Sequence, residues 1–232
     1  MQAVILTAGL GTRMGALTAD TPKGLLKVAG KTLLEHKFDA LPEEVDEIVL
    51  IVGYLGEMIR GRFGNSYAGR SITYIPCPDP VGGTMYALAQ AKDILKEKFL
   101  VMNGDNIYAK EDMKKVLEKE WATVVIKTDS MQHGAKVKVA QDGTVLDIIE
   151  WGGHDGGSGF TNINLYALDA RIFDFPPVPK ATGSTELGLP QTILAASRTS
   201  GIPFYAVEGT SWLQIKDEES LKAAESQLQK LN

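Results

Sequence analysis

Two cations follow a glycine-rich turn near the N-terminus of the chain. The stretch LTAGLGTRMGALTADTPKGLL, residues 6–26, places Gly9 and Gly11 after an apolar run, then Arg13, and Lys23 behind a proline. Glycines let a backbone approach a phosphate closely with its N–H groups directed at it. Two cations that converge on one loop neutralise the charge of a polyphosphate. The stretch therefore predicts a site for a phosphorylated ligand.

The spacing of these residues does not fit two common nucleotide-binding motifs. A dinucleotide fingerprint needs G-x-G-x-x-G and an acidic residue at the end of the second strand. Here Gly11 is followed by Thr12, Arg13 and Met14, and the second apolar run ends in IVGY. The P-loop pattern G-x-x-x-x-G-K-[ST] is absent as well. Glycines alone would indicate an ordinary tight turn, so the prediction depends on the two cations.

The elements that must position these residues alternate through about the first 125 residues. Short apolar runs predict buried strands, and segments of helical period lie between them. The expected strands are 3–8, 47–54, 71–75, 99–105 and 122–128, and the expected helices are 31–41, 55–63, 84–98 and 110–120. This alternation is typical of a parallel sheet with crossover helices, so we predict a Rossmann-like α/β fold.

The second part of the chain changes in pattern from about residue 135. Residues 135–151 predict a β-hairpin around a Gln-Asp-Gly-Thr turn, inserted into the α/β fold. Residues 152–159 predict a flexible loop, 160–168 a strand and 217–232 a terminal helix. The long irregular segment 176–188 is typical of a binding lid or a disordered loop.

Composition limits the possible ligands and surroundings. The chain has 232 residues, 44% of them hydrophobic, and we expect one domain over residues 1–232. A net charge of -5 argues against a general nucleic-acid binder. Cys77 is the single cysteine, no secretory leader is predicted, and the longest apolar run, Ile48 to Leu55, is too short to span a membrane. We therefore expect a cytoplasmic protein without a membrane or nucleic-acid partner.

The opening stretch resembles the signature of the nucleotidyltransferases that make nucleotide-sugars. That signature is commonly written as G-x-G-T-R-[ML], then P-K and a V-x-G-K-P-L segment. The likeness continues through IVGYLGEMIRGRFGN, ITYI, GGTMYALAQAKDIL and FLVMNGD, and more loosely through VLDIIE, GFTNINLY and WLQIKDEESL. It implies a sugar-1-phosphate nucleotidyltransferase of GT-A-like fold. A nucleotide-binding part is then expected at about 1–127 and a sugar-phosphate-binding part at about 128–232.

The resemblance also implies a role for each matching residue. Ala8 and Gly9 would contact the base and ribose, and Gly11, Thr12 and Arg13 would wrap the triphosphate. Lys23 would reach the α-phosphate and the incoming phosphate, and Gly83 and Thr84 would hold the nucleoside. Asp105 would bind Mg²⁺, and Glu150 and Asn162 would contact the sugar. Structural roles stay open as alternatives: a helix or strand cap for Asp105, a surface position for Glu150 and a loop contact for Asn162.

The implied reaction needs no catalytic triad. A sugar 1-phosphate attacks the α-phosphorus of a nucleoside triphosphate in line, and pyrophosphate leaves. Because the second pKa of a phosphate monoester is near ~6, the nucleophile is already an anion at neutral pH. The reaction then depends on alignment and on charge neutralisation by Mg²⁺, arginine and lysine. His36, which is expected on a helix, His133 and His154 match no catalytic or metal-binding spacing.

One segment departs from the family pattern. Near its C-terminus the family usually has W-x-D-[IV]-G-T-P-E, whose acid is the second protein ligand of Mg²⁺. Here WLQIKDEESL places Gln214 at the acid, Lys216 at the glycine and Asp217 at the threonine. An amide oxygen is an adequate ligand for a hard cation. We therefore expect Gln214 to complete the metal site, with Asp217 as the alternative.

Two other functions remain as alternatives. The GGTMYALAQAKDIL segment lies between the patterns of the sugar branch and of the cytidylyltransferases that activate phosphocholine or inositol phosphate. A regulatory homologue that binds nucleotide-sugar without turnover is the alternative from another class, because Gln214 is neutral. The sequence leaves open the base of the triphosphate and the oligomeric state, monomer or homodimer.

Overall fold

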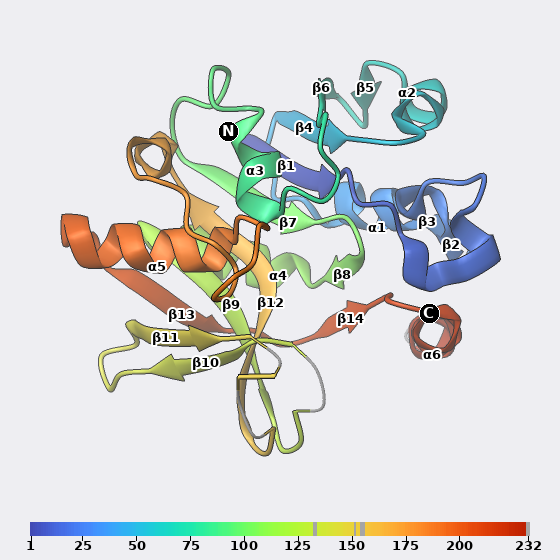
Figure 1. Cartoon of the computed structure of the whole chain (residues 1–232). Coiled ribbons are helices and arrows are strands. Elements are labelled where there is room, and N and C mark those ends of the chain that lie inside the picture. The colour runs from blue at the N-terminus through green and yellow to red at the C-terminus, as the bar shows by residue number, and fades with distance from the viewer. Residues whose placement is uncertain (132–133, 151, 154–155, 231–232) are drawn as a thin grey trace.

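Four parallel strands form one half of a large mixed sheet (Figure 1). The computed structural model describes residues 1–131, 134–150, 152–153 and 156–230. β1 (Gln2–Thr7) pairs with β4 (Glu47–Val52) and with β7 (Phe99–Asn103), and β4 pairs with β6 (Arg70–Pro76). These pairings are parallel, as the sequence predicts. The carboxyl ends of the strands therefore meet at one edge of the sheet, where α/β proteins bind ligands.

The other half of the sheet is built around an antiparallel strand. β12 (Gly159–Leu168) lies between β7 and β9 (Trp121–Thr128) and is antiparallel to both. β13 (Phe204–Glu208) pairs parallel with β9, and the short β5 (Ser66–Tyr67) pairs with β6 at the opposite end. Strand 122–128 runs in the same direction as β7 but does not pair with it. A strand from later in the chain separates it from β7.

The predicted hairpin is present and extends the sheet. β10 (Lys136–Val139) and β11 (Val145–Ile149) are antiparallel, and β10 joins the first part of β12. Ala140 N–H donates to Thr144 O across the turn (2.9 Å), and Gly143 has a φ of 86°. The expected loop at 152–159 lies partly outside the described residues, because 154 and 155 are not among them.

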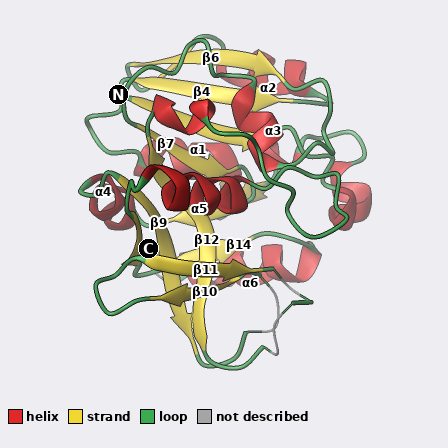
Figure 2. Ribbon diagram, turned by 60° about the vertical axis from the view of Figure 1, so that its left-hand side comes forward, coloured by secondary structure: helices red, strands yellow, loops and turns green. Residues whose placement is uncertain are grey.

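Helices cover both faces of the sheet (Figure 2). α3 (Thr84–Ala89) and α5 (Leu189–Ser200) pack into the hydrophobic cluster on one face. α1 (Leu33–Ala40), α2 (Gly56–Phe63) and α4 (Lys110–Leu117) pack into the cluster on the other face. The residues of β1 divide between the two clusters, Val4 on one side and Ala3 and Ile5 on the other. This division is typical of a strand that is buried on both faces.

The start of α1 has a clear local signal, whereas the end of α3 does not follow the helical period of the sequence. α1 begins with a capping box, in which Thr32 Oγ1 accepts from Glu35 N–H and the Glu35 carboxylate accepts from Thr32 N–H. The helix predicted over 84–98 is shorter than expected and ends at Ala89. Ala91, Lys92 and Ile94 each donate to the carbonyl three residues earlier. The chain therefore tightens into successive turns that bury Ala91 and Leu95.

The C-terminal segment returns to the parallel half of the molecule. β14 (Trp212–Gln214) pairs with β8 (Asn106–Tyr108), which directly follows the end of β7. The predicted terminal helix is α6 (Glu218–Gln229), and it packs with Ile215 against a cluster that includes β2 (Lys27–Val28). The smaller elements are β3 (Lys31–Thr32) and the 3-10 helices η1 (Thr12–Thr18), η2 (Lys23–Leu25) and η3 (Ala170–Asp174). Among the described residues every helix is too short or too polar to cross a bilayer.

Candidate active site

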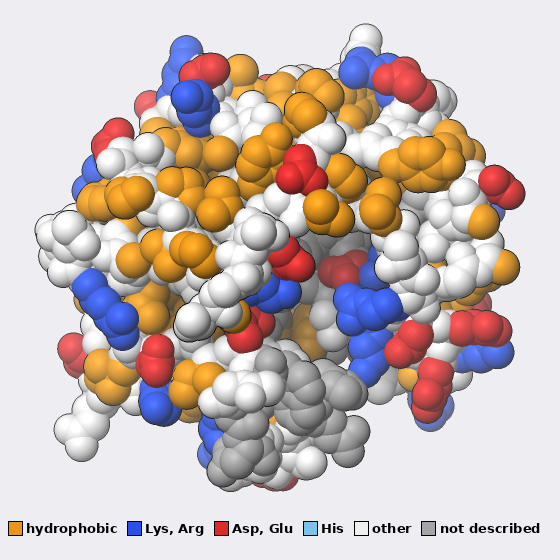
Figure 3. Space-filling model, viewed as in Figure 1, with side chains coloured by type: hydrophobic (Ala, Val, Ile, Leu, Met, Phe, Trp, Pro, Cys, Tyr) orange, Lys and Arg blue, Asp and Glu red, His pale blue; other side chains and the backbone are white. Residues whose placement is uncertain are grey.

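A cleft with a volume of about 510 Å³ opens at the carboxyl ends of the parallel strands. Figure 3 shows this face hollowed near its centre, with basic and acidic side chains at the hollow. The cleft is lined by all the residues predicted to bind the nucleotide and its phosphates: Ala8, Gly9, Gly11, Thr12, Arg13, Lys23, Gly83, Thr84 and Asp105. Segments that are separated by up to a hundred residues in sequence therefore form one site.

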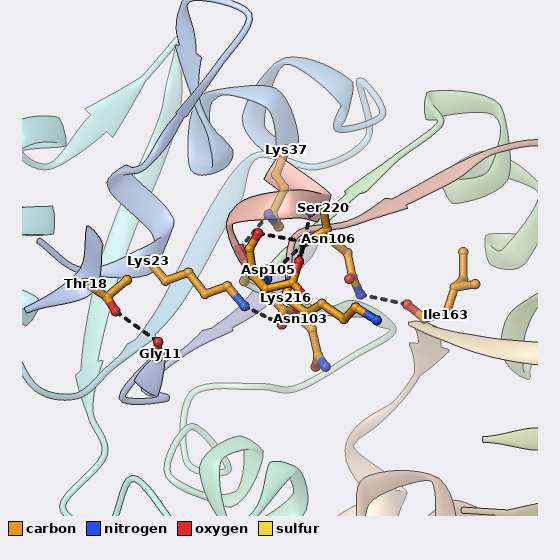
Figure 4. A network of polar contacts seen from close by, with 12 residues as sticks. Gly11, Thr18, Lys23, Lys37, Asn103, Asp105, Asn106, Ile163, Lys216 and Ser220 are labelled. Carbon is orange, nitrogen blue, oxygen red and sulfur yellow. Dashed lines mark hydrogen bonds and ion pairs between the residues drawn. The ribbon is translucent and has the colours of Figure 1, made fainter. Parts of the chain in front are cut away.

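An ion pair joins two of the predicted catalytic residues (Figure 4). Lys23 Nζ lies 2.9 Å from Asp105 Oδ2, and both side chains are largely shielded from solvent. The other carboxylate oxygen, Asp105 Oδ1, is buried and has no hydrogen-bond partner. A buried oxygen of this kind is a binding position for a donor or a cation. Arg13 is exposed at the rim of the same cleft, on η1.

The backbone holds Asp105 at the point where β7 turns into β8. Gly104 N–H donates to Leu6 O (2.8 Å), and Ile215 N–H donates to Asp105 O (2.9 Å). A Cβ on Gly104 would lie 2.8 Å from Leu6 O, so this position requires glycine. The sequence NGD is therefore a tight junction between two strands, and the aspartate that follows the glycine has a fixed place in the cleft.

A buried lysine beneath the cleft was not predicted from the sequence. Lys37, on α1, is fully buried, and its Nζ donates to Gly104 O (2.8 Å) and Leu33 O (3.2 Å). Desolvation lowers the pKa of Lys37 to about 7, while nearby Asp105 raises this pKa and Lys23 lowers it. The ionisable groups of Lys23, Lys37 and Asp105 therefore interact electrostatically at this side of the cleft. The period of α1 places Lys37 beside buried Leu33, Leu34 and Phe38, but it gives no sign that the amine reaches Gly104.

The low pKa of Lys37 predicts that the free energy of unfolding rises with pH above neutrality. Between the native pKa of about 7 and the ordinary value of 10.5, the unfolded chain binds a proton here that the native chain does not. Stability then increases by up to ~1.4 kcal/mol per pH unit, and below about pH 7 this contribution stops changing. Urea unfolding of wild type and Lys37→Met at about pH 6.5 and pH 9 measures the slope. Equal slopes in the two proteins would contradict the lowered pKa.

The turn at Gly83 and Thr84 is held by the long irregular segment 176–188. Gly83 has a φ of 94°, and a Cβ there would lie 2.4 Å from Leu187 O. Leu187 N–H donates to Gly82 O (2.8 Å), and Leu189 N–H donates to Thr84 Oγ1 (3.0 Å). The segment predicted as a lid or disordered loop is therefore docked on this turn. It also contributes Glu186 to the lining of the cleft, which the sequence did not predict.

Glu150 and Asn162, the residues predicted to contact the sugar, do not line the cleft in this structure. Glu150 Oε1 accepts from Gln191 Nε2 (2.8 Å), which pairs the end of β11 with α5. Asn162 is buried, and its side chain bonds Thr123 Oγ1 (2.8 Å) and Tyr166 OH (2.7 Å). Because Thr123 is in β9 and Tyr166 is in β12, these contacts stabilise the sheet and not a loop. A sugar contact for either residue stays a prediction.

Gln214 and Asp217 lie on either side of the junction between β14 and α6. Gln214 is opposite Asn106 in the β8–β14 ladder, and Asn106 is the residue that directly follows Asp105. Asp217 caps α6: its Oδ1 accepts from Ser220 N–H (2.8 Å) and Ser220 Oγ (2.7 Å). These hydrogen bonds lower the pKa of Asp217, and Lys216 and Arg13 lower it further. The contacts occupy Asp217, and Gln214 is not among the residues that line the cleft, so a metal-binding role for Gln214 stays a prediction.

The histidines give no further site among the described residues. His36 lies on α1, as expected, and its Nε2 is 2.7 Å from Val28 O. His133 and His154 lie outside the described residues. Within the part of the chain that the structure describes, no three His, Cys, Asp or Glu side chains are grouped as metal ligands. A cation at Asp105 therefore needs phosphate, amide or water oxygens to complete its coordination.

The fold and the cleft together define an α/β protein with a charged cleft at the carboxyl ends of its parallel strands, lined by Arg13, Lys23 and Asp105. Comparison of the sequence with known protein families leads to the same class of protein. The chain belongs to the MobA-like NTP transferase domain family, whose model matches residues 3–164. Of the residues described above, the matched region includes the glycine-rich turn, Lys37, Gly83 and Asp105. It does not include the docked segment 176–188 or Gln214.

Two curated relatives and one crystal structure show the extent of the similarity. The bifunctional protein GlmU of Methanococcus maripaludis is 32% identical over 190 residues, which are 81% of this chain and 45% of GlmU. The UTP–glucose-1-phosphate uridylyltransferase AglF of Haloferax volcanii is 42% identical over 109 residues, 47% of this chain and 44% of AglF. The matched regions thus cover less than half of either relative. A Bacillus anthracis protein assigned as a glucose-1-phosphate thymidylyltransferase superimposes with a TM-score of 0.84 at 20% identity, over 100% of this chain and 97% of that one, and confirms the fold.

Proposed function

We propose that this protein transfers a nucleotidyl group from a nucleoside triphosphate to a sugar 1-phosphate, giving a nucleotide-sugar and pyrophosphate. The observation that carries the proposal is the convergence of Arg13, Lys23 and Asp105 on one cleft beside the glycine-rich turn. Membership of the NTP transferase family supports the reaction type. The similarity to AglF, a uridylyltransferase acting on glucose 1-phosphate by its name, supports the sugar-phosphate substrate.

The residues of the cleft account for the steps of this reaction without a general base. The sugar phosphate oxygen attacks the α-phosphorus, the bond to the β-phosphate oxygen breaks, and pyrophosphate leaves with the electron pair. In this proposal, Lys23 neutralises charge on the α-phosphate and on the incoming phosphate. Arg13, at the rim, neutralises the β- and γ-phosphates. Charge neutralisation and alignment of this kind supply most of the rate in phosphoryl transfer.

The residues around Asp105 fit a divalent cation. Asp105 Oδ1 is buried without a partner, which is a position that a cation would satisfy, and Gln214 is opposite the next residue, Asn106, in the β8–β14 ladder. Carboxylate and amide oxygens are both donors that Mg²⁺ accepts. When bound, Mg²⁺ supplies positive charge and a fixed geometry at the phosphates. We accordingly include Mg²⁺ dependence in the proposal, with Asp105 and Gln214 as the protein ligands.

The proposal also assigns one substrate to each of the two parts of the chain, and it places the protein in the cytoplasm. Residues 1–127 would bind the nucleotide and 128–232 the sugar phosphate, with Glu186 as an addition from the second part to the nucleotide cleft. The cytoplasm is the compartment that supplies both substrates. Gln191 donates a hydrogen bond to Glu150 where the end of β11 meets α5. A sugar that bound at this end of β11 would contact this polar pair.

The test is release of pyrophosphate from a panel of triphosphates. UTP, dTTP, CTP and GTP are each combined with sugar 1-phosphates, phosphocholine and inositol phosphate, in the presence of Mg²⁺. Turnover with a sugar 1-phosphate supports the proposal. Turnover of CTP with phosphocholine or inositol phosphate would identify the cytidylyltransferase alternative. Nucleotide-sugar binding in calorimetry without pyrophosphate release from any pair would indicate the regulatory homologue.

Gln214 provides a prediction about the metal requirement. Gln214→Asp adds a carboxylate charge and is expected to lower the Mg²⁺ concentration for half-maximal rate by about tenfold, whereas Gln214→Leu removes the ligand and should raise it. The rate is measured against Mg²⁺ concentration for both variants. Gln229→Asp, on the exposed end of α6, is the matched control and should leave the requirement unchanged. A requirement unaffected by Gln214→Leu would remove Gln214 from the metal site.

A further inference from the structure

Lys37 is a fully buried amine that the reaction described above does not use. It lies on the face of α1 with Leu33, Leu34 and Phe38, which are also fully buried. Both acceptors recorded for its Nζ in the described chain are backbone carbonyls, Leu33 O and Gly104 O. A methionine here would fill similar space without the penalty for desolvating an amine. Packing alone therefore does not account for a lysine at this position.

The contact with Gly104 O acts on Asp105. That carbonyl belongs to the peptide group between Gly104 and Asp105, so the 2.8 Å hydrogen bond from Lys37 fixes the peptide plane before the Asp105 Cα. The hydrogen bond from Ile215 N–H to Asp105 O fixes the plane after it (2.9 Å). With both planes held, the direction in which the Asp105 side chain leaves the backbone is set. The two donors come from elements far apart in sequence, α1 and the segment after β14.

The side chain of Asp105 is then oriented between two lysines. Lys23 binds Oδ2, and Oδ1 remains buried without a partner. Figure 4 shows Lys23 and Lys37 reaching the Asp105 junction from different elements. Lys23 acts directly on the carboxylate, and Lys37 acts on the peptide group that carries it. The contacts of Lys23 and Lys37 together therefore determine which oxygen of Asp105, namely Oδ1, is left without a partner.

We propose that Lys37 is a positioning residue for Asp105: its amine fixes the peptide group before Asp105 and so keeps the carboxylate in the orientation that leaves Oδ1 free for a divalent cation. The inference rests on the proposed function for the identity of the cation as the Mg²⁺ of nucleotidyl transfer. The contacts themselves are independent of that reaction. The matched family model includes Lys37, but the proposal depends on the hydrogen bond to Gly104 O and on the burial of the side chain.

The experiment compares Lys37→Met with Lys98→Met. Lys98 is the matched control, because its Nζ also donates to two backbone carbonyls, those of Leu117 and Lys119, at a distance from the cleft. Binding of Mn²⁺, as a probe for Mg²⁺, is measured by electron paramagnetic resonance at about pH 8 for each protein. Hydrogen exchange of the segment 103–108 is measured on the same proteins.

Lys37→Met is expected to weaken Mn²⁺ binding by about 10-fold to 100-fold, the range for residues that orient a metal ligand. Exchange at 103–108 should accelerate, and the nucleotide affinity without metal should change by less than about twofold. Lys98→Met should bind Mn²⁺ like wild type. If Lys37→Met does not fold, Lys37→Gln, which keeps a neutral N–H donor on a shorter side chain, should weaken binding in the same direction by a smaller factor.

Unchanged Mn²⁺ binding in Lys37→Met, together with loss of binding in Asp105→Asn, would overturn the positioning role. Equal weakening in Lys37→Met and Lys98→Met would also overturn it, because the effect would then be one of stability. Failure of the proposed function has a different signature, which is the lack of pyrophosphate release by wild type with every pair of substrates. The metal-binding comparison does not require turnover, so the two failures are distinguishable.

Discussion

Lys23→Ala is expected to reduce the rate of pyrophosphate release at least ~100-fold while leaving the fold intact. The ammonium of Lys23 lines the cleft and lies 2.9 Å from the Asp105 carboxylate. Under the proposed function, its removal takes away the group that would neutralise both reacting phosphates. Arg13→Ala is expected to have an effect of the same order through the leaving pyrophosphate. Substrate turnover under saturating Mg²⁺ measures both variants.

The control for these variants is Lys27→Ala. Lys27 is an exposed cation on β2, four residues beyond Lys23, and does not line the cleft. It should turn over like wild type, and circular dichroism should show the same helix and strand content in all the variants. Near-normal turnover in soluble Lys23→Ala or Arg13→Ala would remove that residue from the phosphate site.

Asp105→Asn is expected to be nearly inactive, with a loss of ~100-fold or more in turnover. The substitution keeps the size and shape of the side chain but removes the charge that Lys23 neutralises and that a cation at Oδ1 requires. Activity should also disappear in excess chelator. Both are measured as pyrophosphate release, with Mg²⁺ restored in the second case to show that the chelator acts on the metal.

The matched control for Asp105→Asn is Asp39→Asn. Asp39 is also an aspartate paired with a lysine, Lys31, at 2.6 Å, but it lies outside the cleft. Its replacement should leave turnover and the metal requirement unchanged. Full activity of Asp105→Asn, or full activity without a divalent cation, would contradict the assignment of Asp105.

The sequence predicted the parts of the site that depend on local motifs. The glycine-rich turn follows β1 and the acid after NG follows β7, whereas the Pro-Lys pair lies at the start of η2. Parallel pairing brings the ends of strands together, so recognising the strands was sufficient to place the turn and Asp105 in one cleft. The hairpin, the terminal helix and most of the buried runs were predicted for a similar reason, because each has a clear local period.

The remaining features depend on contacts between distant segments. The place of β12 between β7 and β9 is a matter of strand order, which local hydrophobic patterns do not encode. The role of Lys37 depends on the carbonyl of Gly104, 67 residues away, and the docking of Leu187 on Gly82 joins segments still further apart. The truncated helix at Ala89 has a similar cause, since burial of Ala91 and Leu95 overrides a helical period in the sequence.

The β8–β14 ladder has a consequence for how the chain acquires its site during synthesis. Asn106 pairs with Gln214, and Asp105 O is bonded by Ile215 N–H, so the junction that carries Asp105 receives its last partners from residues more than a hundred positions later. Contacts of such long sequence separation form late, because a long loop must close first. On the ribosome, the glycine-rich turn and its parallel strands emerge well before these partners. The chain therefore passes through a stage in which the surroundings of Arg13 and Lys23 exist but Asp105 is not yet fixed, and nucleotides meet a completed site only after the C-terminal segment has been made.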